Sequence, residues 1–125
     1  MQNSSTSGHH DSLQQRLVEY AEVISYDRIP REAMEAARLR IIDTLGVLIG
    51  GFSDAGCRRL RGMADELPHA GGATVIGTRA KTTLDMAAFV NATTARCAEM
   101  TDTYHVHGSA GGHPSDMITP LLAVA

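Results

Sequence analysis

Residues 99–116 carry the densest set of chemically active side chains in this 125-residue chain. The stretch combines carboxylates and hydroxyls with the imidazoles of His105, His107 and His113, in a segment loosened by glycines. A histidine titrates near neutrality, so it can donate or accept a proton at physiological pH. Neighbouring amides and hydroxyls can meanwhile hold a carboxylate. The combination predicts acid–base chemistry on an anionic substrate, with His113 as the leading candidate.

The residues around Pro114 predict the start of a helix. Proline fits the first helical position, which makes His113 the N-cap residue and places Ser115 and Asp116 in the first turn. Free backbone N–H groups and the positive end of the helix dipole would then favour a carboxylate or phosphate beside His113. Asp116 is a competing occupant, because its own carboxylate can accept hydrogen bonds from the same donors.

Metal binding and hydrolase chemistry fit the residue pattern less well. His105 and His107 could chelate a metal from an extended segment, but no Cys-x-x-Cys or His-Glu-x-x-His spacing accompanies them. We therefore predict no metal site, and keep zinc binding by this pair as an alternative. The segment around Ser109 lacks the Gly-x-Ser-x-Gly pattern that exposes a nucleophilic serine. Cys57 and Cys97 each fall in a helical pattern, and we expect two free thiols.

The composition is that of an ordinary globular domain, with 43% hydrophobic and 20% charged residues. A net charge of −3 gives no reason to expect a nucleic-acid partner. No segment approaches the roughly 20 consecutive apolar residues that a membrane span needs, and no secretory signal begins the chain. We expect a cytoplasmic location.

The hydrophobic periodicity predicts an all-α domain over residues 12–125, preceded by a flexible polar tail over residues 1–11. The β-branched run at 73–76 predicts one short extended segment, after a turn at 69–72. The apolar C-terminal residues carry no helix-stop signal, and we expect the chain to be truncated within a helix. Four helices are expected: over 13–24, from Pro30 to Gly50-Gly51, from the N-cap Ser53 to Leu67, and over 84–98. In the second of these, the residues expected to be buried are Met34, Ala37, Ile41, Leu45 and Leu48.

Several polar positions are expected to have structural roles. The small residues of the 84–98 helix predict that it lies deep between other helices, so Asn91 must find hydrogen-bond partners there. Asp43 is expected to cap a helix or pair with an arginine. Arg58, Arg59 and Arg61 are expected to form a solvated face.

Five ordered motifs resemble the signatures of the MmgE/PrpD family, which includes 2-methylcitrate dehydratase and cis-aconitate decarboxylase. They are IIDTLG at 41–46 with the glycine pair that follows, ATVIG at 73–77, AAFVN at 87–91, DTY at 102–104 and GHPSD at 112–116. The resemblance covers the chain from about residue 13 onward. It implies the N-terminal part of a helical domain that distant segments complete, and a homodimer. It also implies lyase chemistry on small di- or tricarboxylates without a cofactor.

The resemblance also assigns site residues by position. His113 matches the family's active-site histidine, and Thr103 and Asp102 match its Asp-Thr pair. Glu99 stands where dehydratases and decarboxylases of the family carry an aspartate. The resemblance thus implies that His113, Glu99 and Asp102 are catalytic and that Thr103 and Ser115 bind substrate.

Two alternatives remain at this stage. One is an isomerase or epimerase of the same family, and the other is a non-catalytic helical interaction module in which residues 99–116 are only a linker. We also expect residues 1–125 alone to be inactive, because their apolar faces require partners.

Overall fold

The computed structural model describes residues 12–105, 107–108 and 111–125. The tail predicted over residues 1–11 lies outside this part of the chain. The chain forms two compact units, one up to Met34 and one from Glu35 onward. The described residues contain five α-helices, one 3-10 helix and two short strands, joined by turns and loops. This confirms a helical fold with a small extended part. None of these helices is long and apolar enough to cross a membrane.

The first unit contains α1 (Ser12–Val23), the 3-10 helix η1 (Tyr26–Arg28) and the start of α2 (Arg31–Gly51). The helix predicted over 13–24 is confirmed. Its apolar positions are nevertheless exposed, at 59% for Leu13 and 60% for Leu17. The periodicity therefore identified the helix, but the first unit by itself does not bury these apolar positions.

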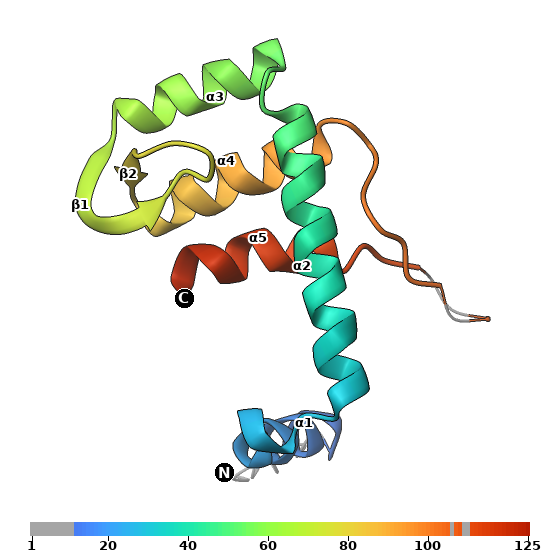
Figure 1. Cartoon of the computed structure of the whole chain (residues 1–125). Coiled ribbons are helices and arrows are strands. Elements are labelled where there is room, and N and C mark those ends of the chain that lie inside the picture. The colour runs from blue at the N-terminus through green and yellow to red at the C-terminus, as the bar shows by residue number, and fades with distance from the viewer. Residues whose placement is uncertain (1–11, 106, 109–110) are drawn as a thin grey trace, which may run out of the picture. The chain divides into compact units, whose positions relative to one another are not determined.

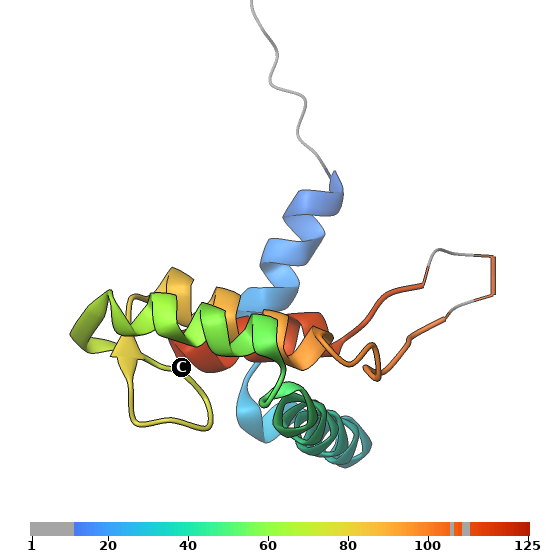
Figure 2. The same ribbon diagram turned by 90° about the horizontal axis from the view of Figure 1, so that it is seen from above.

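Three helices of the second unit, α3 (Ala55–Asp65), α4 (Leu84–Arg96) and α5 (Ser115–Val124), run beside one another with α4 in the middle (Figures 1 and 2). The small side chains of α4 allow this close packing, because Ala87 and Ala95 are almost fully buried. The deep position predicted for this helix is confirmed. Two apolar clusters form the core, one of Ala64, Val75 and Val90 with Leu60 and Met86, and one of Ala73, Ala87 and Ala123 with Ala88.

The extended segment is longer than predicted. β1 (Pro68–Thr74) pairs antiparallel with β2 (Lys81–Thr82), with an irregular register between Pro68 and Ala73. The predicted turn at 69–72 is therefore wrong, since these residues belong to β1. The turn comes later, where Gly77 has φ +86°. Val75 N–H donates to the Ala80 carbonyl, so the chain reverses direction between these two residues.

Asn91 joins this hairpin to α4. Its side chain is 2% exposed, its Oδ1 accepts from Ile76 N–H at 2.9 Å, and its Nδ2 donates to the Thr74 carbonyl at 3.1 Å. The amide thereby pairs with two backbone groups at the C-terminal end of β1, as a buried polar side chain must. The structural role predicted for Asn91 is confirmed.

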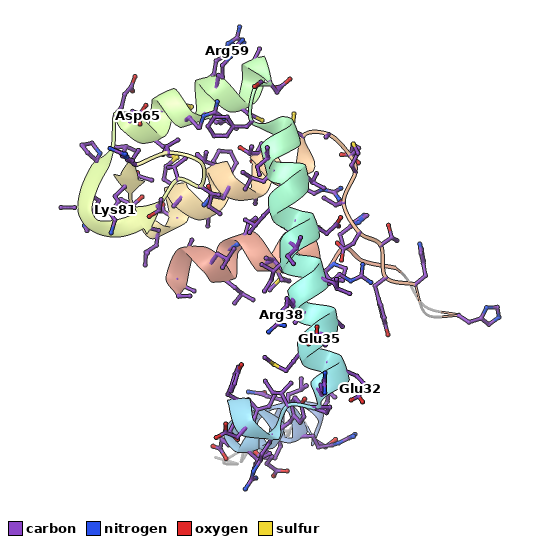
Figure 3. The ribbon with its side chains drawn as sticks, in the orientation of Figure 1. Glu32, Glu35, Arg38, Arg59, Asp65 and Lys81 are labelled. Atoms are coloured by element: carbon purple, nitrogen blue, oxygen red, sulfur yellow. The ribbon has the colours of Figure 1, made fainter. Side chains whose placement is uncertain are left out.

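The N-cap of α3 differs from the prediction. Asp54, not Ser53, caps the helix, because its Oδ1 accepts from Gly56 N–H at 2.7 Å and from Cys57 N–H at 3.2 Å. Both residue types are good caps, so the sequence alone does not choose between neighbours. The predicted solvated face is correct for Arg59, which points away from α4 (Figure 3). Arg61 instead stacks on the Phe52 ring at 3.7 Å and donates to the Phe52 carbonyl.

The predicted buried stripe on α2 is wrong for most of its length. Leu48 is 1% exposed, whereas Ile41 is 36% exposed and Asp43 lies at the surface. The helix ends at Gly51, as predicted. Gly51 also permits a close approach, since a Cβ built there would lie 2.3 Å from the Thr94 carbonyl oxygen. α2 thus contacts α4 at its C-terminal end.

Candidate active site

Two backbone hydrogen bonds close the loop that carries the predicted site. Tyr104 N–H donates to the Gly112 carbonyl at 2.7 Å, and Gly112 N–H donates back to Tyr104 at 2.9 Å. This isolated antiparallel bridge places the residues just outside it opposite each other. It therefore brings Asp102 and His113 together, although they lie 11 positions apart in the chain.

Asp102 caps α5 from a distant position in the chain. Its Oδ1 accepts from Ser115 N–H at 3.0 Å, and its side chain is only 3% exposed. The helix begins at Ser115 with Pro114 as the N-cap residue, so the prediction of His113 as N-cap is wrong. The carboxylate of Asp102 accepts a hydrogen bond at this helix start, where the sequence had suggested a bound anion or Asp116.

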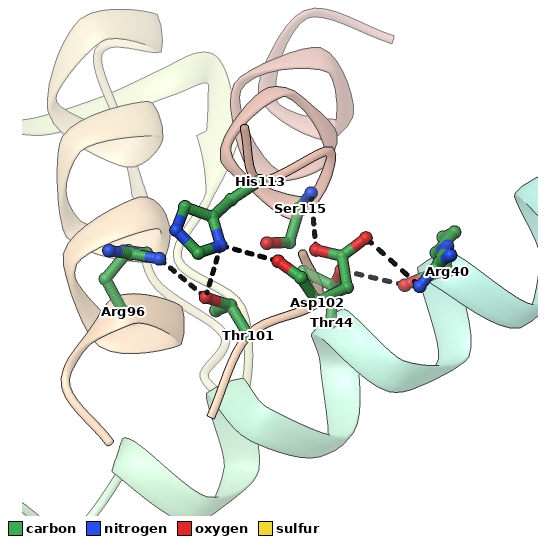
Figure 4. Close-up of polar contacts among 7 residues, drawn as sticks. All are labelled: Arg40, Thr44, Arg96, Thr101, Asp102, His113 and Ser115. Carbon is green, nitrogen blue, oxygen red and sulfur yellow. Dashed lines mark hydrogen bonds and ion pairs between the residues drawn. The ribbon is translucent and has the colours of Figure 1, made fainter. Parts of the chain in front are cut away.

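Arg40 of α2 provides the charge partner of Asp102. Its Nη1 lies 3.5 Å from Asp102 Oδ2, without the geometry of a hydrogen bond (Figure 4). A buried carboxylate needs such compensation, which the arginine and the helix N-terminus supply from opposite sides. The arginine pairing expected for Asp43 is thus found at Asp102 instead.

His113 is held through one ring nitrogen. Its Nδ1 lies 2.5 Å from the Asp102 backbone carbonyl oxygen and 3.4 Å from Thr101 Oγ1. A carbonyl oxygen can only accept, so we assign the hydrogen of the neutral ring to Nδ1. The assignment leaves Nε2 with its lone pair, and this nitrogen is the one that can accept a proton from another molecule.

Arg96, at the end of α4, links the other side chains of the loop. Its Nη1 donates to Thr101 Oγ1 at 2.5 Å, and it pairs with Glu99 Oε2 at 3.7 Å and Asp116 Oδ1 at 3.6 Å. The guanidinium therefore fixes the hydroxyl that contacts His113. It also engages the Asp116 carboxylate, which leaves the start of α5 to Asp102.

Glu99 has an exposed carboxylate and an unusual backbone. Its side chain is 79% exposed, and its φ is +50°, the one positive value among the described non-glycine residues. Its N–H donates to the Arg96 carbonyl, so Glu99 closes the turn that follows α4 in a left-handed conformation that residues other than glycine rarely adopt.

The structure brings three of the five predicted site residues into direct contact: His113, Asp102 and Ser115. Glu99 joins them through Arg96, while Thr103 is exposed on the loop next to Asp102. Ser115 is 2% exposed, and its Oγ has no hydrogen-bond partner among the described residues. His105 and His107 are both exposed and belong to no cluster of metal ligands found in the described part of the chain.

Sequence reasoning missed Thr101, Arg96 and Arg40. Thr101 lies within residues 99–116, and its position directly before Asp102 could have indicated a place in the site. Arg96 is the last residue of α4, and the small side chains of that helix predict a role in packing rather than in a functional site. Arg40 belongs to α2, and no local pattern connects it with the loop.

The arrangement defines a helical protein in which a histidine is oriented by a backbone carbonyl beside a carboxylate-capped helix. The sequence model of the MmgE/PrpD N-terminal domain matches residues 15–125. The chain therefore belongs to the MmgE/PrpD family, as its motifs indicate. No curated protein and no solved structure matches the chain.

Proposed function

We propose that this chain is the N-terminal part of a lyase that dehydrates or decarboxylates small di- or tricarboxylic acids by acid–base catalysis. The orientation of His113 carries the proposal. Because the Asp102 carbonyl holds Nδ1, the Nε2 atom is free to take a proton from a substrate or return one. Membership of a family that contains dehydratases and decarboxylases supports the same chemistry.

The contacts of Asp102 favour a positioning role. Its carboxylate is engaged by Ser115 N–H and Arg40, and its carbonyl oxygen aligns the imidazole. Asp102 would thus act on the reaction through His113. The exposed carboxylate of Glu99 is the better candidate for direct contact with substrate, where its extra methylene relative to the family's aspartate would alter substrate choice.

The two predicted hydroxyls differ in access. Thr103 is exposed and can hydrogen-bond a substrate carboxylate directly. Ser115 is buried, so it would reach substrate only if the start of α5 moved. We therefore propose Thr103 as the primary substrate-binding hydroxyl and Ser115 as a group that supports it.

The full-length protein is proposed to be a cytoplasmic homodimer that needs no cofactor, with residues 1–125 inactive by themselves. The described residues expose several large apolar side chains of α5, including Met117 at 63% and Leu121 at 57%. Contiguous exposed apolar surface generally marks an interaction site. A light-scattering mass of the full-length protein tests the dimer, and a monomer would contradict it.

The function is tested by incubating the full-length protein with citrate-like and succinate-like acids. Loss of water or release of carbon dioxide supports a lyase. Inversion of a stereocentre without a change of mass indicates an isomerase or epimerase. No turnover of any acid, with a folded protein, supports the non-catalytic interaction module and overturns the proposal.

A further inference from the structure

A second cluster of reactive side chains lies where α3 begins and α4 ends. One ligand atom each from Asp54, Cys57 and Cys97 lies within 4.8 Å of the other two. Asp54 is the N-cap residue of α3, Cys57 lies in the first turn of that helix, and Cys97 follows the last residue of α4. The packing of the two helices therefore assembles the cluster, and the candidate active site uses none of its members.

The backbone fixes two of the three side chains. Asp54 Oδ1 accepts the N–H groups of Gly56 and Cys57, which holds the carboxylate at the start of α3. Cys57 is 2% exposed, so packing determines the direction of its thiol. Cys97 is exposed and closes the cluster on the solvent side. Asp54 and Cys57 are thus held in place by the protein, while the exposed Cys97 leaves the cluster accessible to an ion from solvent.

The three side chains also interact electrostatically, because they lie so close together. A hydrogen bond with the Cys57 thiol, partial desolvation and the charges of Cys57 and Asp54 raise the pKa of Cys97 to about 11 from its ordinary 9.0. The anionic form of Cys97 is therefore disfavoured beside Cys57 and Asp54. A divalent cation removes this repulsion, since a metal ion binds thiolates and displaces their protons.

We propose that Asp54, Cys57 and Cys97 form a binding site for Zn²⁺, with water as the fourth ligand. Two thiolates favour zinc over magnesium or calcium, which prefer oxygen ligands. Tetrahedral zinc with Zn–S distances of about 2.3 Å keeps its ligand atoms close enough together to suit this cluster. Binding at neutral pH releases the two thiol protons to solvent, and no electron transfer is required.

The helix dipole is compatible with this ligand set. Three anionic ligands around a dication leave one net negative charge at the N-terminus of α3, where the dipole favours negative charge. The cap hydrogen bonds to Oδ1 also orient the carboxylate as outer-shell partners do at metal sites. The ion would tie the start of α3 to the end of α4, close to the loop that carries the candidate active site.

The test is a titration of the full 125-residue chain with Co²⁺ and then Zn²⁺, under a non-thiol reductant and without oxygen. We expect one Co²⁺ per chain with thiolate-to-cobalt charge-transfer absorption, which an equivalent of Zn²⁺ abolishes. Cys97→Ser is the main variant, because this residue is exposed and its replacement leaves the core intact. It should weaken Zn²⁺ binding by at least the roughly 10–100-fold that loss of an outer-shell partner costs.

Asp54→Asn separates ligation from capping. Asparagine still caps a helix but is a poor zinc ligand, so binding should weaken while the fold persists. The double variant His105→Ala/His107→Ala is the matched control and should bind as the parent does. Absent charge-transfer absorption, equal affinity in Cys97→Ser, or binding lost only in the histidine variant overturns the proposal. A Cys57–Cys97 disulfide that persists in the reductant overturns it as well.

Discussion

The Nδ1 atom of His113 lies 2.5 Å from the backbone carbonyl oxygen of Asp102, and the side chain of the same aspartate caps the helix that follows the histidine. One residue thus fixes both the imidazole and the helix beside it. The arrangement depends on the Tyr104–Gly112 bridge, which sets the two residues opposite each other.

Replacement of Asp102 should separate its two roles. Asp102→Ala removes the cap of α5 and should cost about 0.5–2 kcal/mol of unfolding free energy. Asp102→Asn keeps a cap acceptor but loses the charge opposite Arg40, so it should be the milder change. Denaturant unfolding of both variants measures the difference. Equal losses would show that the ion pair, and not the cap, dominates.

Gly51→Ala should destabilise the chain by about 1–3 kcal/mol, as overpacking generally does. The new Cβ would lie 2.3 Å from the Thr94 carbonyl oxygen, so α2 and α4 must separate. Gly46→Ala in the same helix is the matched control, since a Cβ there meets no atom within 4 Å. The control should gain about 0.5–1 kcal/mol from helix propensity. Two variants of equal stability would contradict the close approach.

Asn91→Ala should cost about 2–4 kcal/mol. The change leaves the Ile76 N–H and the Thr74 carbonyl without their side-chain partner, and each unsatisfied buried group costs about 1–3 kcal/mol. Thermal or denaturant unfolding provides the measurement. A loss well below 1 kcal/mol would show that water replaces the amide at the hairpin.

The cap of α3 should make stability depend on pH. Hydrogen bonds from the N–H groups of Cys57 and then Gly56 lower the pKa of Asp54 below its ordinary 3.8. The folded state therefore holds the charged form more tightly than the unfolded state does. This contribution is present above pH 3.8 and is lost as the pH falls through the lowered value.

Melting temperatures of the parent chain and Asp54→Asn, both measured with a chelator, test this dependence. The parent should be the more stable at neutral pH, and the difference should shrink as the pH falls below 3.8. A difference that stays constant down to the acid limit would mean that the carboxylate charge contributes nothing to the cap.

The sequence predicted the features that depend on local pattern. The periodicity located the helices, and the small residues of α4 predicted its central position. The polarity of Asn91 within that helix predicted a structural partner. Burial was less predictable, because an apolar stripe says nothing about which neighbour covers it. The exposed face of α2 around Ile41 shows this clearly.

The candidate site was predictable in its residues but not in their contacts. The motif match singled out Asp102 and His113, but the Tyr104–Gly112 bridge that joins them follows from loop closure and leaves no periodic signal. Arg40 reaches Asp102 from a helix far away in the chain, so only the tertiary structure reveals the pair. The catalytic and binding roles of all five predicted site residues stay predictions.

The most direct test of the proposed function is the turnover number of His113→Asn in the full-length protein, measured beside its melting temperature. The asparagine amide can still donate near the position of Nδ1, but it has no counterpart of Nε2. We predict that turnover falls by roughly 10²–10⁴-fold, as loss of a general acid or base does, while the melting temperature hardly changes. His69→Asn, an exposed site in β1, is the control and should keep full turnover. Near-normal turnover of His113→Asn would remove this histidine from the mechanism and contradict the account.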